Sequence, residues 1–334
     1  MNTPLPKRRF LRRALVLAAI LGLGGAAVVA RWFLNDHGKN DMAAAEQSAF
    51  QLNDIPFNGA RAYEYLKQLC AIGPRPSGSA GMEQQQKLLA EHFKKLGGVV
   101  EFQRFRVRHP QDGSAVPMTN ILVHWQPETK ERILLCAHYD TLPFPMMDRE
   151  NPQGVFVGAN DNAGGVAILM ELANDISGLK LPLGIDFLLL DGEEFRFSEQ
   201  DRFFLGSEYF ARDYVKNKPG YRYRWGVLLD MVSDADLQLY QERNSLWWKD
   251  TRPLVKEIWD TAARLGVKEF IPKPKHELSD DHLMLHDIGK IPCIDIIDFD
   301  YPAWHTQNDT PAQCSPLSMA KVGWVLEEWL KTVK

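Results

Sequence analysis

Four short apolar runs recur along the chain, and segments with helical spacing separate or follow them. The runs cover residues 133–137, 185–190, 225–229 and 291–297. Asp186 interrupts the second run, and short apolar runs of this kind are typical of strands that are covered on both faces. Helices are expected over residues 207–216, 252–265 and 316–330, and another is expected to begin at Asp161. This alternation predicts a single α/β domain, with a mostly parallel central mixed sheet flanked by helices on both faces.

Acidic and histidine residues follow these runs, at the positions where the strands are expected to end. They are His138, Asp140, Asp161, Glu193, Glu194, Asp230 and His305. Taken alone, Asp161 is explained equally well as a helix N-cap. Together, such residues are costly to bury without a partner, and zinc binds oxygen and nitrogen ligands of this kind. Because ligands of α/β proteins collect at the carboxyl ends of the strands, we predict a zinc site there.

The first 34 residues differ from the rest of the chain. Five basic residues precede an uncharged apolar stretch over residues 14–30. As a helix this stretch would span about 25 Å, somewhat less than a hydrocarbon core of about 30 Å. It is either a signal anchor or a signal peptide cleaved after Ala30. Both alternatives export the remainder, to a periplasm, the cell exterior or a Golgi or ER lumen, either anchored to the membrane or secreted.

Composition sets the remaining limits. Residues 35–57 are polar and lack periodicity, so we predict a tether there and a catalytic domain over residues 58–334. The formal net charge is −4, which gives no indication of nucleic-acid binding. The four cysteines include no Cys-x-x-Cys pair, so thiolate zinc and redox motifs are absent from the sequence.

From about Arg61 to Leu330 the chain resembles the superfamily of zinc-dependent aminopeptidases and glutaminyl cyclases, which share the family-28-type metallopeptidase fold. The matching segments are His138-Tyr139-Asp140, residues 158–165, Asp191-Gly192-Glu193-Glu194, Gly206-Ser207, Leu229-Asp230 and His305-Thr306. Five or more motifs in the same order are specific as a set. The resemblance implies an enzyme that acts on the N-termini of peptides.

Two chemistries occur in that superfamily. In the aminopeptidases, by resemblance, His138 and Asp230 would bind one zinc ion, Glu194 and His305 a second, and Asp161 would bridge them. In the cyclases a single zinc ion would be bound by Asp161, Glu194 and His305, while Asp230 would act as a hydrogen-bonding catalytic residue. In both cases the resemblance makes Glu193 the residue that transfers the proton.

Several segments resemble the glutaminyl-peptide cyclotransferase-like branch more closely. Asp280 matches a catalytic aspartate of the cyclases, and Trp304 matches the tryptophan that lines their substrate pocket. The segment after Glu194 resembles a cyclase loop, in which Phe197 is the aromatic candidate for substrate binding. Against this, a cyclase histidine in the last strand is replaced here by Asp295. We therefore predict cyclisation of N-terminal glutamine with release of ammonia, and keep an exported two-zinc aminopeptidase as the alternative.

For other histidine and aromatic residues we favour a structural role over a role in the site. His282 and His286 have the spacing of a helical metal pair, yet Asp280 is the better functional candidate in that segment. Trp247 and Trp248 could line a peptide-binding rim, but packing beneath a loop is the interpretation we favour. None of these four residues is included in the predicted site.

Overall fold

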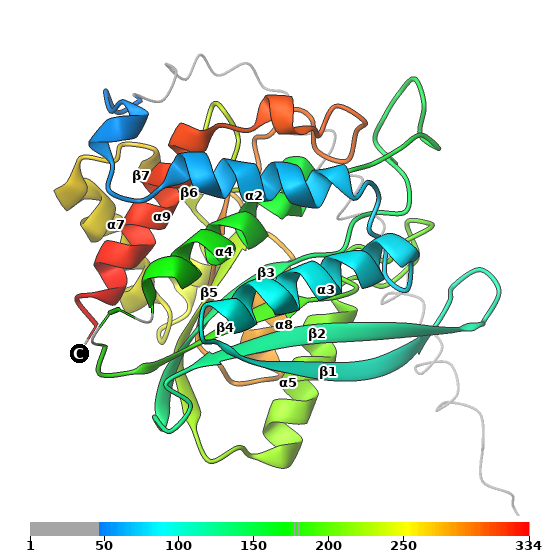
Figure 1. Cartoon of the computed structure of the whole chain (residues 1–334), viewed down its shortest axis with the longest axis horizontal. Coiled ribbons are helices and arrows are strands. Elements are labelled where there is room, and N and C mark those ends of the chain that lie inside the picture. The colour runs from blue at the N-terminus through cyan, green and yellow to red at the C-terminus, as the bar shows by residue number, and fades with distance from the viewer. Residues whose placement is uncertain (1–46, 177, 180, 334) are drawn as a thin grey trace, which may run out of the picture. The chain divides into compact units, whose positions relative to one another are not determined.

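The computed structural model describes residues 47–176, 178–179 and 181–333, which form the domain drawn in Figure 1. Its centre is a six-stranded sheet with the order β1-β2-β4-β3-β5-β8. The strands are β1 (Val99–Arg108), β2 (Ala115–Trp125), β3 (Glu131–His138), β4 (Gly184–Leu190), β5 (Arg222–Asp230) and β8 (Cys293–Ile297). The pairs β4/β3, β3/β5 and β5/β8 are parallel, whereas β1/β2 and β2/β4 are antiparallel. The predicted mixed, mostly parallel sheet is confirmed.

Helices cover both faces of this sheet (Figure 1). One face packs against α2 (Gly59–Ala71), α3 (Ala80–Lys95), α4 (Gly165–Ile176), α7 (Arg252–Leu265) and α9 (Pro316–Leu330). The other packs against α5 (Leu205–Asn217) and α8 (Asp281–Asp287). Successive residues of β3 alternate between them: Leu135 contributes to the first core, and Leu134 and Cys136 to the second. An apolar run such as 133–137 is therefore buried on both faces, as its composition predicted.

The sequence pattern does not predict several short elements. A second, two-stranded parallel sheet pairs β6 (Leu239–Gln241) with β7 (Phe270–Pro274). Helices α6 (Arg243–Trp247) and α8 are also short, as are the single turns η1 (Leu52–Asp54), η2 (Ala159–Gly164) and η3 (Pro311–Gln313). Segments of three to seven residues are too short for a periodic apolar pattern to identify.

The predicted tether over residues 35–57 is wrong for its last part. Phe57 is only 1% exposed and packs so closely on Gly323 of α9 that a Cβ there would meet its ring at 2.3 Å. Ser48 donates its backbone N–H and its hydroxyl to Glu269, at 2.9 Å and 2.8 Å. Tertiary contacts rather than local periodicity hold this segment, so residues 48–57 belong to the domain. The part of the tether before residue 47 lies outside the described residues.

The apolar segment over residues 14–30 also lies outside the described residues. Among the helices of residues 47–333 that the structure describes, none is both long enough and apolar enough to cross a bilayer. Signal anchor and cleaved signal peptide therefore both stay predictions.

A buried ion pair joins β3 and β4 at the end of the sheet that lies opposite the predicted site. Arg132 of β3 donates to both oxygens of Asp186 in β4, at 2.9 Å and 2.5 Å. Tyr223 donates its hydroxyl to the same carboxylate at 2.7 Å, and His124 Nδ1 lies 2.8 Å from it. Asp186 and Arg132 are 0% and 1% exposed. The carboxylate is thus stabilised only by these partners.

Replacing Arg132 by methionine is expected to lower the free energy of unfolding by about 3–5 kcal/mol, because it leaves Asp186 buried without its main partner. Urea denaturation measures the change. Arg222→Met is the control, because it removes an exposed ion pair of the same sheet, between Arg222 of β5 and Glu131 of β3. We expect no resolvable loss from the control, and equal losses from both variants would contradict the buried-pair assignment.

Candidate active site

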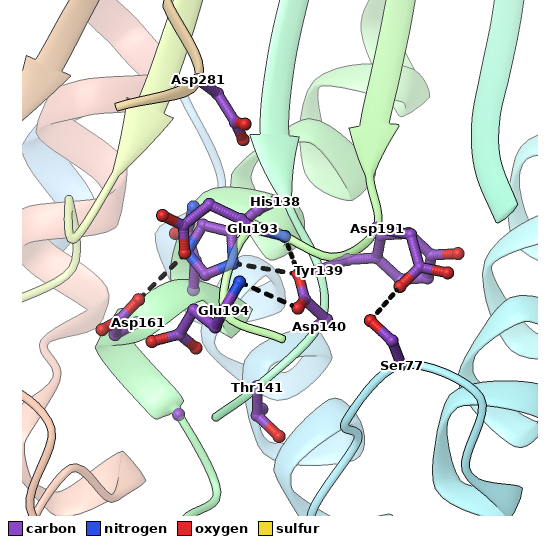
Figure 2. Close-up of polar contacts among 12 residues, drawn as sticks. Ser77, His138, Tyr139, Asp140, Thr141, Asp161, Asp191, Glu193, Glu194 and Asp281 are labelled. Carbon is purple, nitrogen blue, oxygen red and sulfur yellow. Dashed lines mark hydrogen bonds and ion pairs between the residues drawn. The ribbon is translucent and has the colours of Figure 1, made fainter. Parts of the chain in front are cut away.

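The strand ends bring the predicted residues to one edge of the sheet. His138 is the last residue of β3 and Asp230 is the last residue of β5. Glu193 and Glu194 follow β4 after Gly192, whose φ of +78° turns the chain in a conformation that glycine adopts without strain. His305 lies beyond β8. Figure 2 shows His138, Asp161, Glu193 and Glu194 gathered past the ends of the strands.

Asp161 is positioned differently from the prediction. The regular helix α4 begins only at Gly165, and Asp161 lies in the preceding turn η2 with φ −112° and ψ 84°. Asp161 therefore does not open the helix, and it does not act as its N-cap. Asp309 accepts the backbone N–H groups of Asn160 and Asp161, at 2.8 Å and 3.1 Å, and so holds this turn.

Asp161 lies between two imidazoles. Its Oδ1 is 3.0 Å from His138 Nε2, and its Oδ2 is 3.3 Å from His305 Nε2. His138 Nε2 is also 3.5 Å from Asp230 Oδ1, and His305 Nε2 is 2.9 Å from Glu194 Oε1. Two groups of possible ligand atoms share Asp161, namely His138/Asp161/Asp230 and Asp161/Glu194/His305, and a third consists of His138, Glu193 and Glu194. This geometry is that of a carboxylate placed to bridge two ligand sets.

The charges of the site fit a divalent cation. Burial, together with the neighbouring carboxylates, raises the pKa of Glu193 and of Glu194 well above the ordinary value. Burial acts in the same direction on Asp161, but its contacts with His138 and His305 outweigh it and lower the pKa of that carboxyl. Asp230 Oδ1 is buried and accepts no hydrogen bond. The site thus holds more carboxylates than hydrogen-bond donors to pair with them. Carboxylates and imidazoles are ligands that zinc takes in proteins.

A layer of hydrogen bonds orients these ligands. Asp140 accepts the backbone N–H groups of Glu193 and Glu194, at 3.1 Å and 3.0 Å (Figure 2). One of its oxygens lies 3.7 Å from His138 Nδ1, on the side of the ring away from Asp161. The backbone N–H of Leu142 donates to Glu194 Oε2 at 2.9 Å. A carboxylate behind a ligating histidine fixes the ring and its tautomer, and the position of Asp140 suits such support of His138 better than direct binding of a metal.

An apolar wall adjoins the site. Trp304 stacks on His305 with ring centroids 4.0 Å apart, and His305 itself has a left-handed φ of +56°. Trp304 belongs to a cluster with Met231, which follows Asp230, and Leu278, which precedes Asp280 by two residues. This apolar cluster therefore adjoins three of the predicted site residues. Its position is suited to the aliphatic part of a substrate.

The two other predicted residues take distinct positions. Asp280 caps the start of α8 and is 4% exposed. Its donor atoms group with those of His282 and Asp295, within 4.8 Å of one another. Phe197 packs instead against Phe195 and His109, with centroids 5.2 Å and 4.4 Å apart. Substrate contact by Phe197 thus stays a prediction.

Comparisons with known proteins agree with this geometry. The family model described as peptidase family M28 matches residues 120–330. The structure of Fimbriiglobus ruber glutaminyl cyclase is similar with a TM-score of 0.80 and 39% identity, over 86% of this chain and 98% of that one. A leucine aminopeptidase precursor from Bacteroides thetaiotaomicron is similar with a TM-score of 0.78 and 30% identity, over 83% and 98%.

A curated relative from Mus musculus is named glutaminyl-peptide cyclotransferase-like protein. It is 26% identical over 297 residues, which is 80% of this chain and 73% of that protein. The family match covers more than half of the chain and includes every residue of the metal-binding geometry described above. The chain belongs to peptidase family M28.

Proposed function

We propose that the protein is a glutaminyl-peptide cyclotransferase, which converts the N-terminal glutamine of a peptide to pyroglutamate and releases ammonia. The observation that carries this proposal is the position of Asp280, which α8 brings to the carboxylate group around Glu193 and Asp230. Burial, and the nearby Asp230 and Asp281, raise the pKa of Asp280 well above its ordinary value. A carboxyl group in such surroundings can keep a proton and donate a hydrogen bond to the amide that reacts.

The residues suited to hold zinc for this reaction are Asp161, Glu194 and His305. A zinc ion bound there supplies Lewis-acid polarisation of the substrate's γ-carbonyl group. With one ion, His138 and Asp230 remain as hydrogen-bonding partners of Asp161 and of the substrate. With two ions, they become ligands of the second.

In this proposal Glu193 transfers the proton. Its backbone N–H donates to Asp140, the residue is 8% exposed, and its carboxyl group lies close to His138 and Glu194. In the proposed reaction the neutral α-amine attacks the γ-carbonyl carbon and forms the lactam C–N bond. Glu193 accepts the proton that the amine loses and delivers it to the departing amide nitrogen, which leaves as ammonia. The attack is intramolecular, so holding the glutamine in a folded conformation against Trp304 contributes to the rate.

The alternative is a two-zinc aminopeptidase. The specific observation in its favour is the complete second ligand group, His138, Asp161 and Asp230. In that reaction Glu193 would take a proton from water rather than from the substrate's amine. The number of bound metal ions therefore separates the two functions.

The proposed location follows from the N-terminal segment. The basic residues before residues 14–30 would stay in the cytoplasm, and the domain would be exported, either tethered by that segment or secreted after cleavage at Ala30. Mass spectrometry of the N-terminus of the protein, recovered from both the membrane and the soluble fractions, distinguishes tethering from cleavage.

The function is tested with two peptides that differ only in their first residue, glutamine or leucine. The purified protein is incubated with each, and the products are weighed by mass spectrometry. We expect the glutamine peptide to lose ammonia while keeping all its residues, and the leucine peptide to remain intact. Release of the first residue from the leucine peptide would establish the aminopeptidase instead.

Removal of the metal gives a further prediction. Dialysis against a chelator is expected to abolish turnover, and added zinc is expected to restore it, because no residue of the site replaces the charge of the ion. Elemental analysis of the restored protein should give about one zinc per chain for a cyclase. A value near two, with full activity only at two, would favour the aminopeptidase.

A further inference from the structure

A buried polar cluster lies beside the proposed zinc ligands. None of its residues is one of those ligands. It consists of Asp280 and His282 of the α8 region, Asp295 of β8, and Glu242 before α6. Their exposed fractions are 4%, 0%, 1% and 2%. In the sheet, Asp295 pairs with Leu228, two residues before Asp230. The cluster therefore adjoins the carboxylates of the site without being part of its ligand groups.

His282 occupies the middle of this cluster. Its Nε2 lies 3.5 Å from Glu242 Oε2, and its Nδ1 lies 3.8 Å from Asp295 Oδ2. Both ring nitrogens are buried and make no hydrogen bond at these distances. Trp248 covers the ring, with centroids 5.8 Å apart. The imidazole is thus enclosed between two carboxyl groups and cannot be satisfied by solvent.

Glu242 is the fixed end of the cluster. It accepts the backbone N–H groups of Asn244, Ser245 and Leu278, at 2.9 Å, 2.7 Å and 3.1 Å. Three such bonds hold the carboxylate in one place, and they also tie it to the segment that leads into Asp280. His282 therefore has a rigid partner on one side.

The other end of the cluster is not fixed in this way. Both oxygens of Asp295 are buried without a hydrogen bond, as is Oδ2 of Asp280, whose Oδ1 accepts the Asp281 N–H at 2.5 Å. Buried polar atoms without partners cost free energy, and His282 is the donor that lies among them. An imidazole held at Glu242 can orient Asp295 and Asp280 through small movements of the ring.

We propose that His282, anchored by Glu242, is a positioning residue that sets the orientation of Asp280 through the buried cluster with Asp295. The role of Asp280 in turnover rests on the proposed function; the cluster itself rests on the distances above. His282 does not touch substrate in this account. The last strand, β8, carries Asp295 rather than a histidine, so the imidazole of the cluster comes from α8.

The test replaces His282 by glutamine and compares it with His286→Gln. His286 lies on the same helix, one turn further on, and stacks on Trp248 at 3.6 Å outside the cluster. For His282→Gln we expect kcat to fall about 10–100-fold, as for partners that orient a reacting group, with KM changed by less than about threefold. Bound metal and melting temperature should match the control.

A second variant keeps the groups and exchanges their places: His282→Asp combined with Asp295→His. We expect it to recover most of the kcat that either single change removes, because the imidazole again lies among the carboxyl groups. A purely structural role predicts no such split between kcat and KM and no recovery.

Three results would overturn the proposal. They are an unchanged kcat in His282→Gln, loss of one metal equivalent from that variant, which would make the cluster a metal site, and an exchange variant no more active than either single one. Failure of the proposed function is recognised separately, because the unaltered protein would then not cyclise the glutamine peptide at all.

Discussion

Glutamine in place of Glu193 is expected to lower turnover by about 10²–10⁴-fold, the contribution that a positioned acid–base group makes. The carboxyl group lies close to His138 and Glu194, but it is not in either of the two ligand groups that share Asp161. The amide has nearly the same shape and keeps the backbone hydrogen bond to Asp140. The variant should therefore fold and retain its metal while losing the group that accepts the proton.

Glu199→Gln is the matched control, because it makes the same chemical change six residues later in an exposed part of the loop. Steady-state kinetics and elemental analysis are measured on both variants. If Glu193→Gln kept more than about a tenth of the activity, another group would have to transfer the proton. If it lost its metal, Glu193 would be a ligand.

Asparagine in place of Asp161 is expected to have the opposite signature. Asp161 faces both His138 and His305, so the substitution removes a negative charge from both ligand groups at once. Removing a hydrogen-bond partner of a metal ligand typically lowers metal affinity by about 10–100-fold. Because Asp161 is itself a proposed ligand, we expect a loss of more than about 100-fold. Turnover should disappear together with the metal, and excess zinc should restore only part of it.

Asp175→Asn serves as the control for that variant, since Asp175 is an exposed carboxylate on the following helix α4. Zinc affinity is measured by competition with a chromophoric chelator, and folding by the circular dichroism spectrum. Wild-type affinity in Asp161→Asn would contradict the bridging position of this residue. Together the two substitutions separate proton transfer from metal binding within one cluster.

The sheet and its functional edge were predictable because they depend on local patterns. Short apolar runs such as 185–190, alternating with helical segments, indicate buried strands, and a side chain that directly follows such a run lies at the strand end. That argument alone indicates His138, Glu194 and Asp230. The resemblance adds their expected roles and points to Asp280 and Trp304.

The features that the sequence did not reveal depend on contacts between distant segments. Asp309 holds the turn of Asp161 from almost 150 residues away, and nothing in its neighbourhood marks that role. Residues 48–57 look like a tether because no periodic pattern accompanies their packing on α9. His282 is not among the predicted site residues, and its place between Glu242 and Asp295 becomes visible only when α6, α8 and β8 are brought together.

The most direct test of the account follows the side-chain nitrogen of the substrate. A short peptide is prepared whose N-terminal glutamine carries an isotopic label only in its side-chain amide, and it is incubated with the purified, zinc-loaded protein. The account predicts that the label leaves as ammonia while the peptide keeps every residue and acquires a blocked N-terminus. Recovery of the label in free glutamine, with the peptide shortened by one residue, would contradict it.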